Sequence, residues 1–171
     1  MSCQTTKGHA AFGVGDKKKT ERFKREGSGN DLLQPSGDQE REWFWEGNVQ
    51  DSVVHYLQRQ GYRIKAVADT ASHQTGKDIV AERDGRVLWV SVKGYPRGTA
   101  KTHPSTQAGH WFKHAIFDIL EYRGENEEAA LGVALPDYPR YRKLAKKIEW
   151  LKPVAKFVYF WVRENGEVTV D

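Results

Sequence analysis

Asp78 and Lys93 are the two residues whose types and spacing best suit chemistry on a charged substrate. They lie at the outer ends of two strand-like runs, residues 77–84 and 86–95, which an Asp-Gly turn joins into a hairpin. Counting back from this turn places Asp78 opposite residues 91–93, so one carboxylate and one ammonium are expected at the same end of a sheet. An aspartate can hold a hard divalent ion, and a nearby lysine can steady an attacking water or a developing phosphorane charge. A partly buried structural ion pair is the alternative, and the spacing alone does not decide between the two.

The second run of the hairpin also predicts which side chains face the core. Side chains alternate along a strand, so one face carries Leu88, Val90 and Val92 and the other carries Val87, Trp89, Ser91 and Lys93. The aliphatic face indicates burial. Lys93 is then a cation at the end of a largely apolar strand, which is costly unless a carboxylate pairs with it.

The elements that must position these residues follow from hydrophobic periodicity and turn signals. We expect a helix from Asp38 to Gly61 that contains Gly47 in its middle, where a glycine indicates close packing or a bend. The remaining expected elements are a strand over 62–69, the hairpin over 77–95, a helix over 106–123, a strand over 129–137, a helix over 138–151 and a closing hairpin over 156–170. This order predicts an α/β fold with a mixed central sheet flanked by helices.

The chain divides by composition into a tail and a domain. Residues 1–39 hold six of the 16 glycines and none of the six tryptophans, which predicts a flexible basic tail, and residues 40–171 form the domain. Residues 17–25 carry six positive charges against one negative and could hold a phosphate backbone loosely. A solvated tail or an extended translation start is the alternative.

Bulk composition narrows the class of protein. The 171 residues carry a net charge of +4, with a pI near 9.1 and a mean hydropathy of -0.75, which permits a polyanionic partner without requiring one. No apolar run approaches the roughly 20 residues of a membrane span, and the start of the chain lacks the order of a signal peptide. The single cysteine, Cys3, excludes an internal disulfide framework, and we expect a cytoplasmic protein.

Two short motifs carry a resemblance to a known superfamily. The run GKDIV at 76–80, followed by SVKG at 91–94, resembles the metal-binding core of the PD-(D/E)XK nucleases. This superfamily includes restriction endonuclease-like, Mrr-type and RecB-type enzymes. The resemblance covers roughly residues 42–137 and implies a restriction endonuclease-like core of helix, three-stranded meander, helix and fourth strand.

The resemblance also implies roles for individual residues. Asp78 matches the metal-binding aspartate, Lys93 the catalytic lysine, and Val92 the residue whose backbone carbonyl completes the metal shell. Glu46 matches the first-helix glutamate of several branches. Gln107, with an aromatic residue four positions later, is similar to a glutamine element on the second helix of RecB-type members. Mg²⁺ or Mn²⁺ would be the cofactor, with no small-molecule cofactor.

Ser91 departs from the family pattern, which has Glu or Asp at this position. A hydroxyl adds no charge to a magnesium site, and hard divalent ions favour carboxylates. Glu46 could supply the missing carboxylate from the first helix, or the site could be inactive with the fold kept for binding. Glu82 shares a face with Asp78 but lies four strand residues, or about 13 Å, away.

Basic residues near the predicted site suggest contacts with nucleic acid. The loop after Lys93 holds Arg97, Lys101 and His103 before the second helix opens, and helix N-termini favour anions. The helix over 138–151 carries five further cations, although a charged outer face is what any amphipathic helix shows.

Two functions follow as hypotheses. The first is a divalent-metal-dependent nuclease that hydrolyses phosphodiester bonds in DNA. The second is a catalytically inactive domain of the same fold that binds nucleic acid or a partner protein. A structural ion pair in an unrelated α/β fold is a third reading. DNA is the expected partner, with no membrane, and a homodimer is left open.

Overall fold

The computed structural model describes residues 42–70 and 76–171. The predicted tail, the domain boundary near residue 40 and Asp38 lie outside these ranges. The helices are α1 (Glu46–Arg59), α2 (Pro104–Glu125), α3 (Pro139–Lys147) and α4 (Leu151–Ala155). The strands are β1 (Arg63–Val67), β2 (Ile79–Arg83), β3 (Arg86–Val92), β4 (Ala130–Pro136), β5 (Phe157–Val162) and β6 (Val168–Val170).

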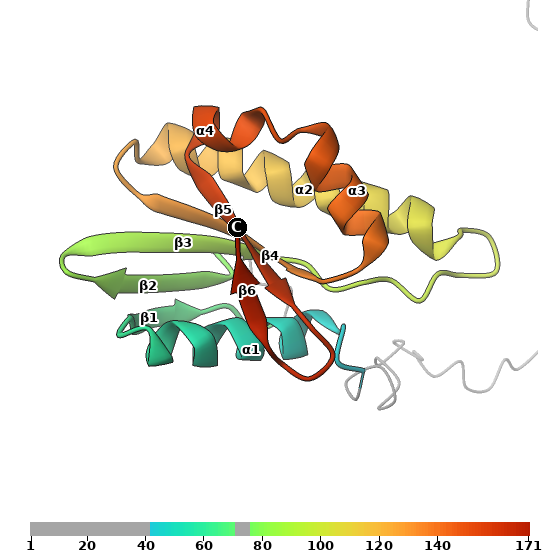
Figure 1. Ribbon diagram of the computed structural model, residues 1–171, viewed down its shortest axis with the longest axis horizontal. Helices are drawn as coiled ribbons and strands as arrows, with labels where there is room; N and C mark the ends of the chain where they lie inside the picture. The colour runs from blue at the N-terminus through green and yellow to red at the C-terminus, as the bar shows by residue number, and fades with distance from the viewer. Residues whose placement is uncertain (1–41, 71–75) are drawn as a thin grey trace, which may run out of the picture. The chain divides into compact units, whose positions relative to one another are not determined.

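The described strands form one six-stranded sheet whose spatial order follows the chain, from β1 to β6. The β3–β4 and β4–β5 pairs are parallel and the other pairs are antiparallel. Each parallel pair needs a crossover, which α2 supplies between β3 and β4, while α3 and α4 supply it between β4 and β5. Helix α1 covers one face of the sheet and the other three helices cover the opposite face (Figure 1). The predicted α/β fold with a mixed, helix-flanked sheet is confirmed.

The β2–β3 hairpin has the predicted two-residue turn. Asp84 and Gly85 both adopt positive φ, 53° and 75°, as this kind of tight hairpin turn requires. The turn sets Ile79 opposite Val90, so the residue before Ile79 falls beside the end of β3. The register counted from the sequence therefore holds at the end of the hairpin that carries Asp78.

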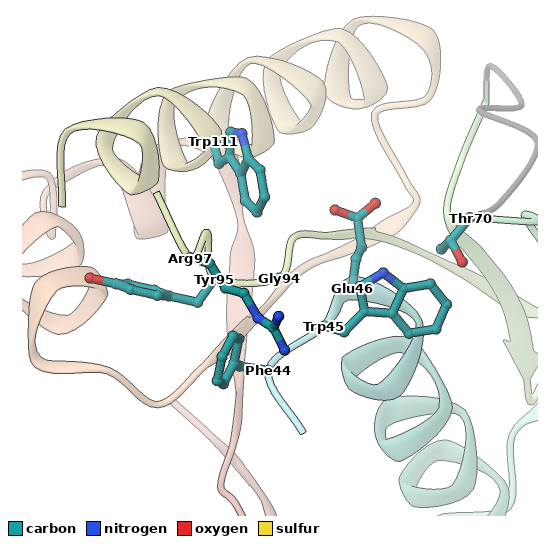
Figure 2. A pocket seen from close by; sticks show the side chains of 8 residues that line it. All are labelled: Phe44, Trp45, Glu46, Thr70, Gly94, Tyr95, Arg97 and Trp111. Atoms are coloured by element: carbon teal, nitrogen blue, oxygen red, sulfur yellow. The ribbon is translucent and has the colours of Figure 1, made fainter. Parts of the chain in front are cut away.

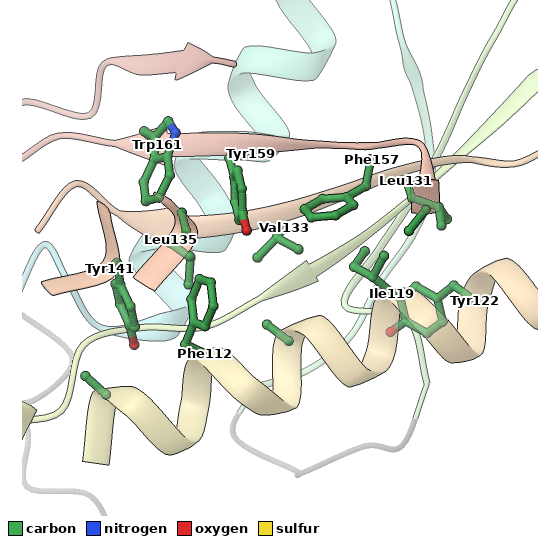
Figure 3. Packing of buried hydrophobic residues seen from close by; sticks show 14 of the residues in the cluster. Phe112, Ile119, Tyr122, Leu131, Val133, Leu135, Tyr141, Phe157, Tyr159 and Trp161 are labelled. Atoms are coloured by element: carbon green, nitrogen blue, oxygen red, sulfur yellow. The ribbon is translucent and has the colours of Figure 1, made fainter. Parts of the chain in front are cut away.

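Two apolar clusters fix the faces of the sheet. Leu88, Val90 and Val92 of β3 are buried against α1, as the alternation predicted. On the opposite face, Figure 3 shows side chains of α2 packed against β4, β5 and Tyr141 of α3. Trp89 of β3 packs against this second cluster. Residues of β3 that share the face of Trp89 consequently point towards α2.

The first helix begins later than predicted. Helix α1 starts at Glu46, and Gly47 is its second residue instead of lying in its middle. The ring of Trp45, the N-cap residue, lies on Gly47 and leaves no room for a β-carbon. The expectation of close packing at this glycine is confirmed, although the helix boundary was wrong.

The predicted helix over 138–151 is also interrupted. Helix α3 ends at Lys147, and α4 begins only at Leu151. Pro153 lacks an N–H and its ring would clash with a helical carbonyl four residues earlier, so a continuous helix cannot run through this segment. Trp150 between the two helices is 66% exposed. Trp161 is 1% exposed, as expected of a core residue.

Candidate functional site

Asp78 and Lys93 meet at the end of the β2–β3 hairpin, as the sequence predicted. The carboxylate of Asp78 accepts a hydrogen bond from the Val92 backbone N–H at 2.6 Å, and the Lys93 ammonium lies 3.4 Å from the same oxygen. Both side chains are mostly buried, with 16% and 19% of their surface exposed. The buried Gln50 of α1 donates to the backbone carbonyls of Asp78 and Ala68, at 2.9 and 3.1 Å. Helix α1 thus fixes the backbone that carries the aspartate.

Asp118 of α2 is a further acidic residue in this site, which the sequence analysis missed. Its Oδ2 lies 3.7 Å from the Lys93 ammonium and accepts a hydrogen bond of 2.6 Å from the hydroxyl of Ser91. Ser91 has no exposed surface. Lys93 therefore lies between two carboxylates, one from the start of β2 and one from α2.

A signal for Asp118 was present in the helical periodicity. It follows Ala115 by three residues and precedes Ile119 by one, and both of these residues are buried on the inward face of α2. An aspartate at the edge of an inward stripe, on the sheet face shared by Ser91, has reason to contact that residue. Finding it required knowing that α2 covers this face, which is tertiary information.

Glu46 joins the same charge cluster from the start of α1. Its carboxylate is hydrogen-bonded by the backbone of Gly94, the residue after Lys93. Burial raises the pKa of Glu46; the Lys93 ammonium opposes this shift, and the charges of Asp78 and Asp118 add to it. Glu46 consequently lies near the site, as expected, in surroundings that resist its ionisation.

Gly94 allows the start of α1 to approach the end of β3. A β-carbon on Gly94 would come within 2.7 Å of two backbone atoms, the Glu46 nitrogen and the Phe44 oxygen. The Tyr95 N–H donates to the same Phe44 carbonyl at 2.8 Å. This close backbone contact holds Glu46 against Lys93.

The lysine in this site is a cation, not a base. Burial acts to lower the pKa of Lys93, but the carboxylates of Asp78, Glu46 and Asp118 outweigh it and raise the pKa above that of an ordinary lysine. Lys93 is therefore protonated at neutral pH. It can stabilise negative charge, but it cannot abstract a proton from water in this state.

The donor atoms of the site suit a hard divalent ion. Asp78 and Asp118 supply carboxylate oxygens, and the two Oδ2 atoms are separated by at most the sum of their distances to the lysine, about 7 Å. The N–H of Val92 points towards Asp78, and the carbonyl of a strand residue points to the same neighbour as its N–H. No group of three or more Asp, Glu, His or Cys side chains close enough for an all-protein cage occurs within residues 42–70 and 76–171. Mg²⁺ usually takes only one or two carboxylates together with water and substrate phosphates, so Asp78 and Asp118 are donors of the kind that it takes.

The other predicted site residues are placed around this centre. Gln107 lies in the first turns of α2 and is partly buried. Arg97 pairs with Glu42 at 2.8 Å. Lys101 is exposed. His103 caps α2, because its Nδ1 accepts a hydrogen bond from the Ser105 N–H at 3.2 Å.

Arg142, on the basic face expected for the helix over 138–151, is used in contacts within the protein. Arg142 of α3 makes two hydrogen bonds to Asp137, at 2.6 and 2.9 Å, and stacks on the ring of Trp161. It also pairs with Asp171 at 3.2 Å. These contacts tie α3 to the C-terminal end of the chain, which is a stabilising role.

A cavity of about 220 Å³ lies beside Glu46. Its walls are largely aromatic, with side chains from the segment before α1, the loop after β3 and α2 (Figure 2). The lining residues are Phe44, Trp45, Glu46, Thr70, Gly94, Tyr95, Arg97 and Trp111. Trp45 is only partly buried and lines this cavity.

No known family model, curated protein or solved structure matches the chain.

Proposed function

We propose that the chain is a divalent-metal-dependent nuclease that hydrolyses phosphodiester bonds in DNA. The observation that carries the proposal is the Lys93 ammonium held between the carboxylates of Asp78 and Asp118 at 3.4 and 3.7 Å. Two carboxylates and one fixed cation provide what phosphodiester hydrolysis needs, which is a place for a divalent ion and a positive charge near the phosphate. The helix, meander, helix and strand order from α1 to β4 supports the restriction endonuclease-like core inferred by resemblance.

Each residue of the site would have a separate role in the proposed hydrolysis. Asp78 and Asp118 would hold Mg²⁺ or Mn²⁺, with the Val92 carbonyl on the same side as Asp78. The ion, when bound, lowers the pKa of a coordinated water and polarises the phosphate. Lys93, charged at neutral pH, stabilises the negative charge that grows on the phosphate oxygens. Gln107 would help to position the attacking water. The basic residues Arg97, Lys101 and His103 would contact phosphates of the DNA.

Asp118 would supply the second carboxylate that Ser91 does not provide. The family pattern has an acid on the strand at this position, and here the buried hydroxyl of Ser91 donates to an acid that arrives from α2. Asp118 is a better candidate for the second carboxylate than Glu46, because burial favours the protonated form of Glu46. Glu46 then lies at the edge of the site and is not a metal ligand in this proposal.

The serine also supports a second candidate, an inactive domain of this fold that binds nucleic acid. In that case the carboxylates and Lys93 form only a structural charge network, as partly buried ion pairs often do. The two candidates differ in one property, which is cleavage that depends on a divalent ion.

Plasmid and single-stranded oligonucleotide substrates, titrated with Mg²⁺ and Mn²⁺, distinguish these candidates. We expect the wild type to cleave at least one of these substrates and Asp78→Asn to lose about 100-fold or more in rate, within the range for a group positioned at the reacting atoms. Asp84→Asn is the matched control, because Asp84 is an exposed aspartate in the turn at the opposite end of the same hairpin. Binding without cleavage in any metal would favour the inactive domain, and equal loss in both variants would remove Asp78 from the mechanism.

A further inference from the structure

We propose that the aromatic cavity beside Glu46 receives one unpaired nucleobase next to the phosphate being cleaved. Its substrate is then single-stranded DNA or a frayed end, not an intact duplex. This inference names the substrate class of the proposed nuclease and rests on that function for the identity of the neighbouring phosphate site.

The walls of the cavity have the character of a base-binding site. Four of its eight lining residues are aromatic: Phe44, Trp45, Tyr95 and Trp111. Stacking on aromatic side chains is the main way in which proteins hold unpaired bases without regard to sequence. Figure 2 shows Trp111 projecting from α2 across the space from Phe44, whereas the ring of Tyr95 points away to the side and packs against Tyr138. The side chains of Thr70 and Glu46 add polar groups that can meet the edge of a base.

The volume of the cavity limits what it can hold. At about 220 Å³ it falls below the roughly 300–1,000 Å³ of pockets that enclose drug-sized ligands. It therefore suits a single planar base and leaves the sugar and phosphate outside. Arg97, which pairs with Glu42, lines the cavity as well.

The cavity adjoins the proposed catalytic centre through Gly94 and Glu46. Gly94, which lines it, directly follows Lys93 in the chain, and Glu46 lines it while being hydrogen-bonded by the Gly94 backbone. A nucleotide with its phosphate at Lys93 would thus have its base beside the cavity. Bases of a duplex are stacked and paired, so entry requires that the base leave the stack, and a single strand meets this requirement at little cost.

The test is the binding of fluorescein-labelled DNA in Ca²⁺, with a single-stranded oligonucleotide and a blunt hairpin duplex as probes. We expect the wild type to bind the single strand at least about 10-fold more tightly than the duplex, in line with the contribution of one base–aromatic stack. Trp111→Leu should lose most of this preference, and Trp111→Phe, which keeps an aromatic ring, should retain it. Trp150→Leu is the matched control, since Trp150 is 66% exposed and lines none of this cavity.

The outcomes separate this inference from the proposed nuclease activity. Equal affinity for both probes, failure to bind either, or equal behaviour of Trp111→Leu and Trp150→Leu would overturn the base-binding cavity, even if the protein cleaves DNA. A single-strand preference that depends on Trp111 supports the cavity, even if no divalent ion produces cleavage. Circular dichroism of each variant shows whether loss of binding comes with loss of the fold.

Discussion

Ser91 and Asp118 bring a hydroxyl and a negative charge to the same site from two different elements. A serine hydroxyl without exposed surface needs a hydrogen-bond partner, and the carboxylate of Asp118 accepts its hydrogen at 2.6 Å. The same carboxylate lies 3.7 Å from the lysine of the site. The strand therefore provides the hydroxyl and the helix provides the negative charge.

Exchanging these two residues tests whether the site can take its negative charge from β3 instead of α2. We expect Asp118→Asn to reduce metal-dependent cleavage about 100-fold, because a ligand beside the reacting phosphate is lost. The double variant Ser91→Asp/Asp118→Ser should recover part of the rate, since it returns the acid to the strand and keeps a hydroxyl opposite it. Cleavage rates and the affinity for Mn²⁺, measured by calorimetry, report the two effects.

Glu121→Gln serves as the control for this exchange, because Glu121 is an exposed acid on the same helix. Wild-type rate and Mn²⁺ affinity in Asp118→Asn, alongside an inactive Asp78→Asn, would show that Asp118 only supports the fold.

At the scale of single residues, local sequence was enough to predict that Asp78 and Lys93 lie close together. Asp78 and Lys93 could be paired by counting along a hairpin whose turn residues, Asp84 and Gly85, fix the register. Asp118 could not be found in this way. Its contact with Ser91 spans 27 residues and depends on which face of the sheet α2 covers.

At the scale of elements, the site depends on how closely the start of α1 approaches the end of β3. Gly94 has no side chain to keep the two backbones apart. The hydrogen bond between the Tyr95 N–H and the Phe44 carbonyl closes the contact at 2.8 Å. This junction places Glu46 beside Lys93 and also forms one wall of the aromatic cavity.

Gly94→Ala should weaken the fold at this junction. Its β-carbon would meet the Glu46 nitrogen and the Phe44 oxygen at 2.7 Å, and backbone atoms cannot turn aside as a flexible side chain can. We expect a loss of about 1–3 kcal/mol in the free energy of unfolding, as for other overpacked sites, measured by urea denaturation.

Gly124→Ala is the matched substitution on α2, where an added β-carbon meets nothing within 4 Å. It should leave stability unchanged or raise it by up to about 1 kcal/mol, because alanine favours a helix over glycine. If the two alanine variants unfold at the same urea concentration, the close approach at Gly94 does not constrain the structure.

Elements with a clear local period were predicted well, and their ends were predicted less well. The hairpin and α2 follow alternation and helical spacing that any window of sequence reveals. The start of α1 at Glu46 depends on the ring of Trp45 lying on Gly47, a packing event that periodicity does not record. The break after α3 had a visible cause in Pro153, which the helical spacing of the apolar residues around it obscured.

At the scale of the whole described domain, the sheet order explains why one end of β3 gathers the charges. Strand β3 is flanked by β2 and β4, and the helices α1 and α2 lie on its opposite faces (Figure 1). Four elements can therefore each deliver one residue to the end of this strand. Asp78 precedes β2, Lys93 follows β3, Glu46 begins α1 and Asp118 comes from α2.

Sequence alone supported the α/β class and the two hairpins, β2–β3 and β5–β6, but not the neighbours of β4. The parallel pairing of β4 with both β3 and β5 requires two crossovers on the same face, and nothing local in the sequence specifies that face. The segments described contain no helix long and apolar enough to cross a membrane.

The central claim is that Lys93 stabilises charge on a phosphate, and Lys93→Met tests it most directly when compared with Lys77→Met. Lys77 is a similarly buried lysine next to Asp78, but it pairs with Glu125 and lies over the ring of Trp89. In Mn²⁺, we predict that Lys93→Met cleaves DNA about 100-fold or more slowly than wild type, as when a charge-stabilising donor is removed, while Lys77→Met stays within a few-fold of wild type. Equal rates in the two variants, or no cleavage by the wild type, would contradict the claim.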